Sequence, residues 1–497
     1  MVRVIGAGEL NVSEPGLGLG LVSELRAIVG TAAVFDQPED LLVYEYDAYL
    51  DRATPDVVVQ PTSADQVAEI VRLAARESLA VVARGGATGL SGGVIPVRGG
   101  IMLDFNRMNR VLEVDGDNGV AIVEPGVFNL DVSAAVAPLG LFYAPDPSSQ
   151  KASTIGGNIA ENAGGPHCLS RGMTTNHVRG VELVTLDGQL IQLGGTAPDP
   201  PGYDLLGLIV GSEGTFGIVT RAWLRLLPLP PHAVTLVAVF ETLEAAGAAV
   251  SAIVAHGVVP SAMELIDGAV AEALGRAFRA AYPPNAGAVL LTDVDGLPDA
   301  VEEEAAVVRL LCESAPGALG LRQAAAAAER DCLWAARRGA LAALALIAPN
   351  YYLGDGVVPR SRLAEVLGTL RAIAAEHGVF LGTVAHAGDG NLHPTILFDA
   401  RQVGVLPRVI LAHDQIIRAC VDAGGTITGE HGVGLEKRKY MPWIFSDSDL
   451  ERMARVREAF DPSGRFNPGK VLPSGDPNTH ETARPLATSA IAPDTWI

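Results

Sequence analysis

Five glycines fall within the ten residues Arg84-Gly85-Gly86-Ala87-Thr88-Gly89-Leu90-Ser91-Gly92-Gly93. The short apolar run at residues 79–83 that precedes them is typical of a buried strand. Glycines let the backbone turn so that several N–H groups point at one anion, and the hydroxyls of Thr88 and Ser91 add further donors. The alternative is a flexible linker, but such linkers are longer and do not follow directly after a strand. The stretch therefore predicts a phosphate-binding loop.

Two further glycine-rich stretches lie downstream of this loop. The first covers residues 145–165 and contains Pro145, Asp146 and Ser148 followed by Thr154, Gly156, Gly157, Asn158, Asn162 and Gly165. The second covers residues 211–220 and contains Glu213, Gly217 and Ile218. Three backbone-rich loops separated by strand-like runs suit a large ligand that is gripped along its length.

Together the three loops resemble the FAD-binding domain of the vanillyl-alcohol oxidase and p-cresol methylhydroxylase (PCMH) superfamily. The resemblance covers about residues 50–472 and is strongest to glycolate oxidase flavin subunits and to D-lactate and D-2-hydroxyglutarate dehydrogenases. It implies that FAD contacts all three loops and Asn467, which lies in the segment Phe466-Asn467-Pro468-Gly469-Lys470. Relatives that tether FAD covalently often carry a histidine near Thr88, and because this chain has none there, we expect non-covalent FAD.

The same resemblance implies an α+β fold in five segments. An N-terminal segment (1–49) precedes a two-lobed PCMH-type FAD-binding domain (50–228), and an α+β, ferredoxin-like substrate domain (229–445) follows. A C-terminal segment (446–473) returns to the flavin, and a polar, Pro-rich tail (474–497) is expected to be disordered. The run Pro228-Leu229-Pro230-Pro231 marks the boundary between the two domains.

Sequence patterns predict the main elements. In the first domain, Ser63 and Gln66 form a capping signal before a helix, and Asp187-Gly188 marks a hairpin turn between strands at 181–185 and 190–193. In the second domain, strands at 380–386 and 393–398 flank a tight loop, and one helix is expected over residues 323–347.

Composition excludes several classes of function. The formal net charge is −21, which disfavours a nucleic acid or an anionic membrane surface as partner. The four cysteines are far apart, which argues against an iron–sulfur cluster or a structural zinc site. No signal peptide is evident, and the longest apolar run, residues 340–349, is too short to span a bilayer. We therefore expect a cytoplasmic protein that is not integral to a membrane.

The N-terminal run Val4-Ile5-Gly6-Ala7-Gly8 begins like a dinucleotide fingerprint, but Asn11 stands where the third glycine belongs. A Rossmann turn is therefore not expected there.

Two histidines, His386 and His393, flank a loop with two glycines, and Glu430-His431 lies in another glycine-bracketed loop. Two imidazoles and a carboxylate make a three-ligand metal site with a position left for substrate, although hydrogen-bonded structural histidines are an alternative. The resemblance implies that His386, His393 and Glu430 bind the metal and that His431 is the catalytic base. Zinc is the expected ion, and mixed N/O ligands also accept manganese or iron.

A hydroxy acid requires a cation for its carboxylate, and the planar fork of arginine suits two oxygens. Candidates are Arg337 and Arg338 in one segment and Arg360 and Arg362 in another, each with solvated surface charge as the alternative. The resemblance favours Arg337 as the carboxylate-binding residue.

The function that the resemblance implies is FAD-dependent oxidation of a small 2-hydroxy acid to a 2-oxo acid, with metal-assisted deprotonation and hydride transfer to flavin N5. Glycolate or D-lactate is favoured, because relatives that oxidise dicarboxylic substrates tend to carry a lysine that is absent from residues 351–356. D-2-hydroxyglutarate dehydrogenase, a flavin subunit without substrate chemistry, and an oxidase of another alcohol are the alternatives.

The electron acceptor is external in this interpretation. An iron–sulfur partner subunit, a quinone, a cytochrome or an electron-transfer flavoprotein would each serve. Homo-oligomerisation is left open by the sequence.

Overall fold

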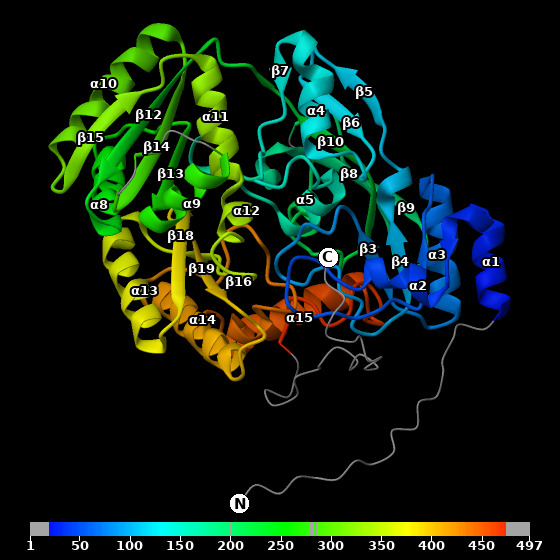
Figure 1. Cartoon of the computed structure of the whole chain (residues 1–497). Coiled ribbons are helices and arrows are strands. Elements are labelled where there is room, and N and C mark those ends of the chain that lie inside the picture. The colour runs from blue at the N-terminus through cyan, green and yellow to red at the C-terminus, as the bar shows by residue number, and fades with distance from the viewer. Residues whose placement is uncertain (1–18, 199–200, 279–281, 284–285, 474–497) are drawn as a thin grey trace, which may run out of the picture.

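The computed structural model describes residues 19–198, 201–278, 282–283 and 286–473. Two lobes lie side by side in Figure 1, the first built from the blue and cyan segments and the second from the green and yellow ones. The helix α15 (Asp447–Phe460) lies between the lower parts of the two lobes in this view, on the path from the second back to the first. Helices and sheets are mixed in both lobes, as the α+β prediction requires.

The first lobe contains two sheets. In one, β1 (Val34–Phe35), β2 (Val57–Val59), β4 (Ile101–Asp104) and β3 (Val81–Arg84) lie in that order, with β2, β4 and β3 parallel. Helix α3 (Ala64–Arg76) connects β2 to β3, and the side chain of Ser63 caps it by accepting from the backbone N–H of Gln66. The predicted cap is therefore confirmed.

The second sheet of this lobe is antiparallel, with the order β5 (Val111–Asp115), β6 (Val120–Val123), β10 (Ile218–Arg225), β8 (Val178–Val184), β9 (Leu190–Gly194). Strands β8 and β9 form the predicted hairpin, and Gly188 takes a positive φ of 75° at its turn. Helices α4 (Asn129–Val136) and α5 (Ile155–Glu161) pack on this sheet in one apolar cluster.

The second lobe is built on one antiparallel sheet. Its main path runs β15 (Ala318–Gln323), β12 (His232–Phe240), β14 (Ala288–Gly296), β13 (Ala262–Asp267), β18 (Phe380–His386), β19 (Asn391–Phe398), β16 (Asn350–Leu353), and β17 (Gly356–Val357) pairs with β19.

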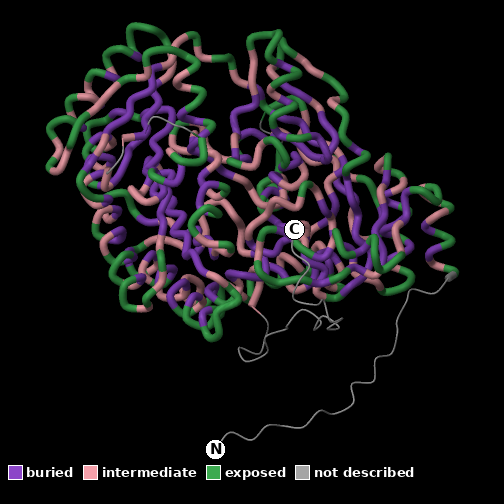
Figure 2. The backbone as a smooth tube through the Cα atoms, in the orientation of Figure 1, coloured by how far each residue is buried: buried purple, intermediate pink, exposed green. Residues whose placement is uncertain are grey.

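Apolar cores cover both faces of this sheet. Leu236 belongs to a core shared with α8 (Leu243–Ala255), α10 (Pro298–Ser314), α13 (Leu363–His377) and α14 (Val405–Asp422). Its neighbour Val237 faces a core shared with α9 (Gly268–Phe278), α11 (Ala327–Arg338) and α12 (Ala340–Leu344). Successive residues of a strand point to opposite faces, so this sheet lies inside the lobe, as the purple strands of Figure 2 show.

One helix prediction was wrong. Residues 323–347 do not form a single helix, because Gln323 ends strand β15 and the helical part divides into α11 and α12 at Gly339. A Cβ at Gly339 would lie 2.3 Å from the ring of Phe278, so the chain passes close to the end of α9 at this point.

Both ends of the described chain pack on the first lobe. Helix α1 (Leu19–Val29) and β1 share its core, so the structure extends this lobe back beyond the boundary drawn at residue 50. At the other end, Phe466 is buried beside β3, where the Val81 N–H donates to Arg465 O and the Asn467 N–H donates to Val81 O, each at 2.9 Å. The N-terminal run at residues 4–11 and the tail 474–497 lie outside the described residues.

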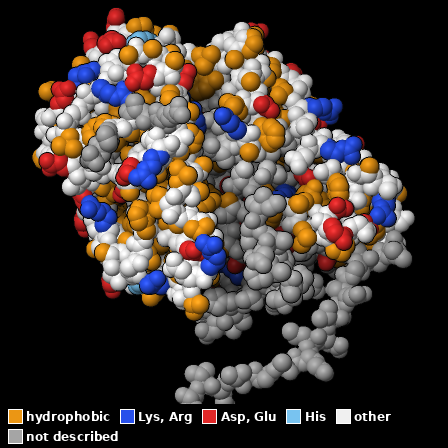
Figure 3. All heavy atoms as spheres, viewed as in Figure 1, with side chains coloured by type: hydrophobic (Ala, Val, Ile, Leu, Met, Phe, Trp, Pro, Cys, Tyr) orange, Lys and Arg blue, Asp and Glu red, His pale blue; other side chains and the backbone are white. Residues whose placement is uncertain are grey.

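Acidic and basic side chains are interspersed on the face shown in Figure 3. Among the described residues, no helix combines the length and the apolar character needed to cross a bilayer.

A buried polar cluster lies between α14 and η7 (Arg438–Trp443). His413 Nε2 lies 3.5 Å from Glu436 Oε1, and the rings of His413 and Tyr352 stack with centroids 4.1 Å apart. Burial raises the pKa of Glu436 to about 7, although the nearby Lys437 ammonium opposes the shift. The carboxyl of Glu436 is therefore protonated in the folded protein under conditions in which the unfolded chain has lost the proton.

We predict that Glu436→Gln becomes more stable relative to wild type as pH rises from 4.5 to 7. In this window the folded wild type holds a proton that the unfolded chain releases, so wild-type stability falls with pH while that of the variant does not. At 1.36 kcal/mol per pH unit, the relative gain approaches about 3 kcal/mol. Urea unfolding at pH 5 and pH 8 measures it.

Glu451→Gln, at an exposed carboxyl of α15, is the matched control and should track wild type at both pH values. A difference between Glu436→Gln and wild type that does not change with pH would contradict the assignment.

Candidate active site

The three glycine-rich loops meet at the ends of strands and line two adjoining cavities. The first loop follows β3, the second leads into α5, and the third precedes β10. The larger cavity has a volume of about 410 Å³ and the smaller about 80 Å³. Thr154 caps α5, since its hydroxyl accepts from the Gly157 N–H at 3.3 Å. The larger cavity thus lies against a helix N-terminus, where backbone donors favour anions.

Most of the residues predicted to contact FAD line these cavities. The larger one is lined by Gly85, Gly86, Ala87, Thr88, Gly89, Leu90, Ser148, Thr154, Gly157 and Asn158. The smaller one adds Arg84, Gly156, Glu213, Gly217, Ile218 and Asn467. Ser91, Pro145, Asp146, Asn162 and Gly165 line neither cavity.

Arg84 contributes to the site by binding backbone carbonyl groups of the N-terminal segment. Its buried guanidinium donates to the carbonyl oxygens of Val43, Tyr44 and Tyr46 at 3.3, 3.5 and 2.9 Å. Asp47 and Ala48, which follow directly, form part of the wall of the larger cavity. The arginine therefore holds this wall in place.

The predicted metal ligands converge. His386 Nε2 and His393 Nε2 lie 3.0 and 3.1 Å from Glu430 Oε1, and the three candidate ligand atoms are all within 4.8 Å of one another. His386 ends β18 and His393 lies on β19, so the tight loop between these strands brings the imidazoles together. Their rings are nearly perpendicular, with centroids 4.9 Å apart.

This donor set fits a divalent metal ion. Ligand atoms about 2 Å from a tetrahedral zinc ion are about 3.3 Å from one another, close to the distances found here. Glu430 Oε2 is buried and makes no hydrogen bond within the described part of the chain. The Nδ1–H of His386 donates to Glu264 Oε1 at 2.7 Å, which leaves Nε2 as the ligand atom.

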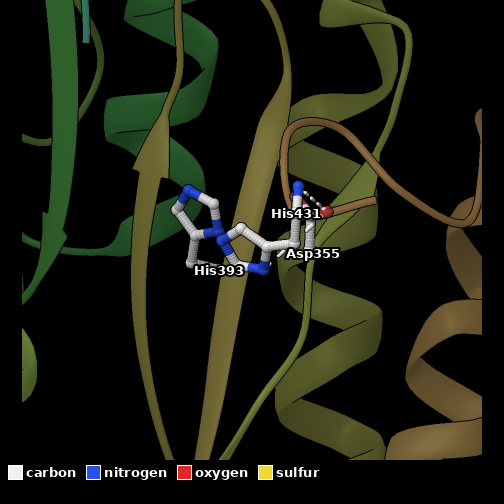
Figure 4. Close-up of side chains that lie close together, drawn as sticks. All are labelled: Asp355, His393 and His431. Carbon is white, nitrogen blue, oxygen red and sulfur yellow. Dashed lines mark hydrogen bonds and ion pairs between the residues drawn. The ribbon is translucent and has the colours of Figure 1, made fainter. Parts of the chain in front are cut away.

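The electrostatics of the cluster favour an ionised carboxylate. Burial alone would raise the pKa of Glu430, but the imidazoles of His386 and His393 outweigh burial and hold that pKa well below its ordinary value. For the third imidazole, burial lowers the pKa of His431 to about 4. The His431 ring stacks on His393 with centroids 5.1 Å apart (Figure 4).

The loop that carries Glu430 and His431 is anchored to its own lobe by Asp355, which lies between β16 and β17. Oδ2 of this fully buried carboxylate accepts from the N–H groups of Gly429 and His431 at 3.0 Å each and from Lys437 Nζ at 2.9 Å. Burial alone would raise the pKa of Asp355, but His431 and Lys437 lower it well below its ordinary value. Figure 4 shows Asp355 directly beside His431.

The same loop is also held by the first lobe. Glu213 Oε1 accepts from the Val433 N–H at 2.7 Å, and Oε2 accepts from the Gly434 N–H at 2.8 Å. The Leu435 N–H donates to Ser91 O at 2.8 Å. Two residues predicted to contact FAD, Glu213 and Ser91, thus join the flavin loops to the histidine-bearing loop.

The four candidate arginines divide into two pairs. Arg337 and Arg338, at the end of α11, line the larger cavity. Arg360 is exposed and donates to Gly388 O at 3.4 Å, while Arg362 pairs with Glu365 on the surface, and neither lines a described cavity.

Several residues of the site were not predicted. The cavity wall includes Glu161, Leu341, Tyr351, Leu353 and Val384. Glu161 lies inside the second glycine-rich loop, and burial, together with the charge of Glu213, raises its pKa well above the ordinary value. The apolar residues carry no signal in the sequence, because only the tertiary packing of α12, β16 and β18 brings them to this wall.

Comparisons with known proteins find matches in both lobes. Residues 55–194 match the family described as FAD binding domain, and residues 229–471 match the family described as FAD linked oxidases, C-terminal domain. The chain is 42% identical over 453 residues to the glycolate oxidase subunit GlcD of Escherichia coli strain K12, with 90% of each chain covered. It is 32% identical over 466 residues to D-lactate dehydrogenase of Anaerostipes hadrus, with 90% of this chain and 95% of that one covered.

A solved structure of p-cresol methylhydroxylase with substrate bound has a TM-score of 0.77 to this chain at 15% identity, over 91% of this chain and 96% of that one. The fold expected from the three loops is confirmed.

We predict that Gly86→Ala loses FAD. A Cβ at Gly86 would lie 2.1 Å from Ala152 O, so the first loop must move away from the second. A displacement that costs about 1–3 kcal/mol weakens FAD affinity about 5- to 150-fold. The FAD-to-protein ratio after gel filtration measures the loss.

Gly20→Ala is the control, since no atom lies within 4 Å of a Cβ at this helical position and FAD content should not change. Full FAD occupancy in Gly86→Ala would remove the first loop from the cofactor site.

Proposed function

The chain belongs to the family of FAD-linked oxidases and oxidises 2-hydroxy acids with FAD, and we propose that glycolate or D-lactate is its substrate. We further propose that FAD is bound without a covalent link and that His386, His393 and Glu430 hold a divalent metal ion. One observation carries the proposal. The first two glycine-rich loops line one wall of the 410 Å³ cavity, and His393, Glu430, His431 and Arg337 line another part of the same cavity.

The carboxylate of the substrate is assigned to Arg337. Its side chain is only 4% exposed and lines the cavity, and its Nε makes no hydrogen bond within the described residues. A guanidinium in this position offers donors to a planar anion. This contact fixes the substrate with its 2-hydroxyl towards the histidine-bearing loop.

His431 is the proposed base that accepts the proton of the 2-hydroxyl. Its backbone is fixed by Asp355 and its ring by stacking on His393, so the imidazole is held in one place in the cavity wall. When bound, the metal ion would polarise the hydroxyl oxygen and FAD would accept the two electrons that leave Cα with its hydrogen. The chain's own residues bind the acid, orient it and take the proton.

The apolar part of the wall favours a small substituent on Cα. Ala340, Leu341, Leu353 and Val384 line the same cavity as the two arginines. They suit the hydrogen of glycolate or the methyl group of D-lactate, because a second carboxylate against apolar carbon would lose its hydration.

A dicarboxylic acid such as D-2-hydroxyglutarate is the second candidate. Arg338 lines the same cavity, is half-buried and makes no ion pair with any described residue. Its charge is therefore available to a second carboxylate. Loss of activity towards D-2-hydroxyglutarate alone in Arg338→Gln would identify this role.

The electrons leave the reduced flavin for an external acceptor in this proposal. The relative from Escherichia coli is named a subunit, which indicates assembly with other chains. The four cysteines of this chain are free and dispersed, so they do not supply a cluster site that could serve as an internal acceptor.

We predict that glycolate or D-lactate bleaches the flavin under anaerobic conditions, and that His431→Gln slows this reduction about 10²- to 10⁴-fold through loss of the base. Stopped-flow absorbance with glycolate, D-lactate, L-lactate and D-2-hydroxyglutarate measures it. His256→Gln, at an exposed histidine ending α8, should react like wild type. A yellow protein that none of the four acids bleaches would favour a flavin subunit without substrate chemistry.

We also predict that a chelator abolishes reduction while FAD stays bound. The rate should fall at least about 100-fold and recover with Zn²⁺ or Mn²⁺, because a Lewis acid contributes several kcal/mol to such a step. His386→Ala should keep FAD but not recover, since one of three ligands is gone. Full activity at less than about 0.1 metal ion per chain would exclude the metal from the reaction.

A further inference from the structure

We propose that Glu264 is a positioning residue that joins the metal-binding part of the site to the carboxylate-binding part. The residue lies on β13 and is completely buried. Its Oε1 lies 2.7 Å from His386 Nδ1, and its Oε2 lies 2.5 Å from Arg337 Nη2. The inference rests on the proposed function, which places a metal ion on His386 and the substrate carboxylate on Arg337.

The pairing register of β13 and β18 determines the contact between Glu264 and His386. Glu264 and His386 are directly opposite each other in the antiparallel pair β13 and β18, so both side chains leave the sheet on the same face. Arg337 approaches the same carboxylate from the last turn of α11, which packs on that face. A carboxylate with no exposed surface requires compensating partners, and here its partners are two residues of the proposed site.

The contact has a defined effect on each partner. An anion at Nδ1 keeps the proton of His386 on that nitrogen and directs the lone pair of Nε2 towards Glu430 Oε1. On the other side, the ion pair holds one end of the guanidinium of Arg337, whose Nε makes no hydrogen bond within the described residues. Glu264 thereby fixes a metal ligand and a substrate-binding group relative to one another.

Only a carboxylate can serve both partners. His386 Nδ1–H is a donor and the guanidinium of Arg337 is a cation, and a carboxylate offers an acceptor oxygen to the first and a negative charge to the second. A glutamine in the same place offers one acceptor and one donor, so its amide nitrogen must face either His386 or Arg337. If Glu264 and Arg337 formed only a structural ion pair, a different result would be expected. Loss of the pair would then damage the fold and FAD binding together.

The test measures Zn²⁺ affinity of the full-length flavoprotein by competition with a chromophoric chelator. For Glu264→Gln we expect affinity about 10- to 100-fold weaker than wild type, with far-UV circular dichroism and FAD content unchanged. Arg337→Met should stay within about threefold of wild type, because it leaves His386 and its carboxylate in place. Glu365→Gln, at an exposed Glu–Arg pair, is the matched control and should bind Zn²⁺ like wild type.

The double variant tests the link between the two partners. When Arg337→Met is combined with Glu264→Gln, the amide oxygen of the substituted side chain is free to face His386. The loss caused by Glu264→Gln should therefore shrink at least about threefold in that background. Equal losses in both backgrounds would show that Arg337 and His386 are not joined through Glu264. If Glu264→Gln loses its fold, Glu264→Asp carries the test, since it keeps the charge but withdraws the carboxylate from both partners.

The failure of this inference differs from the failure of the proposed function. Zn²⁺ affinity of Glu264→Gln within about twofold of wild type overturns the role of Glu264 and leaves the metal site standing. A wild-type protein that binds no divalent ion overturns the metal site itself, and the role of Glu264 with it.

Discussion

The loop at residues 429–434 is held by two buried carboxylates that come from different lobes. Asp355 accepts from the N–H groups at its beginning, and Glu213 accepts from the N–H groups of Val433 and Gly434 at its end. Because Glu430 and His431 lie on this loop, both lobes must be in place before the proposed metal ligand and the proposed base face the glycine-rich loops. The site is therefore a property of the junction between the lobes and not of either lobe alone.

Two buried lysines lie near the carboxylates that hold this loop. Buried carboxylates are costly unless cations or donors surround them. Lys437 neutralises Asp355 directly, and Lys470, which is 1% exposed, donates to Ile95 O at 2.6 Å and to Asn467 Oδ1 at 3.2 Å. Burial lowers the pKa of Lys470 to about 7, which the nearby carboxylate of Glu213 opposes. The C-terminal part of the chain thus supplies both buried lysines that lie near these carboxylates.

The parts of the site that could be predicted from the sequence are those whose residues are close along the chain. A strand followed by glycines identified the first loop, and His386 and His393 could be paired because a short loop must bring their strands together. Glu264 could not be found in this way, since its partners lie 122 and 73 residues further along the chain. A single acidic residue within the apolar run Ala262-Met263-Glu264-Leu265-Ile266 was the available signal. The division between α11 and α12 at Gly339 was missed for a related reason, because the ring of Phe278 that lies against this point belongs to another helix.

The two halves of the cavity differ in how they are built, and the difference follows from what each must bind. The wall that we assign to FAD consists mainly of backbone and small side chains, which suit a large cofactor recognised by its shape and its phosphates. The wall that we assign to the substrate combines apolar side chains with charged and imidazole side chains, and Arg337 there is held by the buried Glu264, which also contacts His386. Recognition of a small substrate then depends on how exactly two or three charges are placed. That placement depends on the register of β13 with β18, and a slip of one residue there would move Glu264 to the opposite face of the sheet.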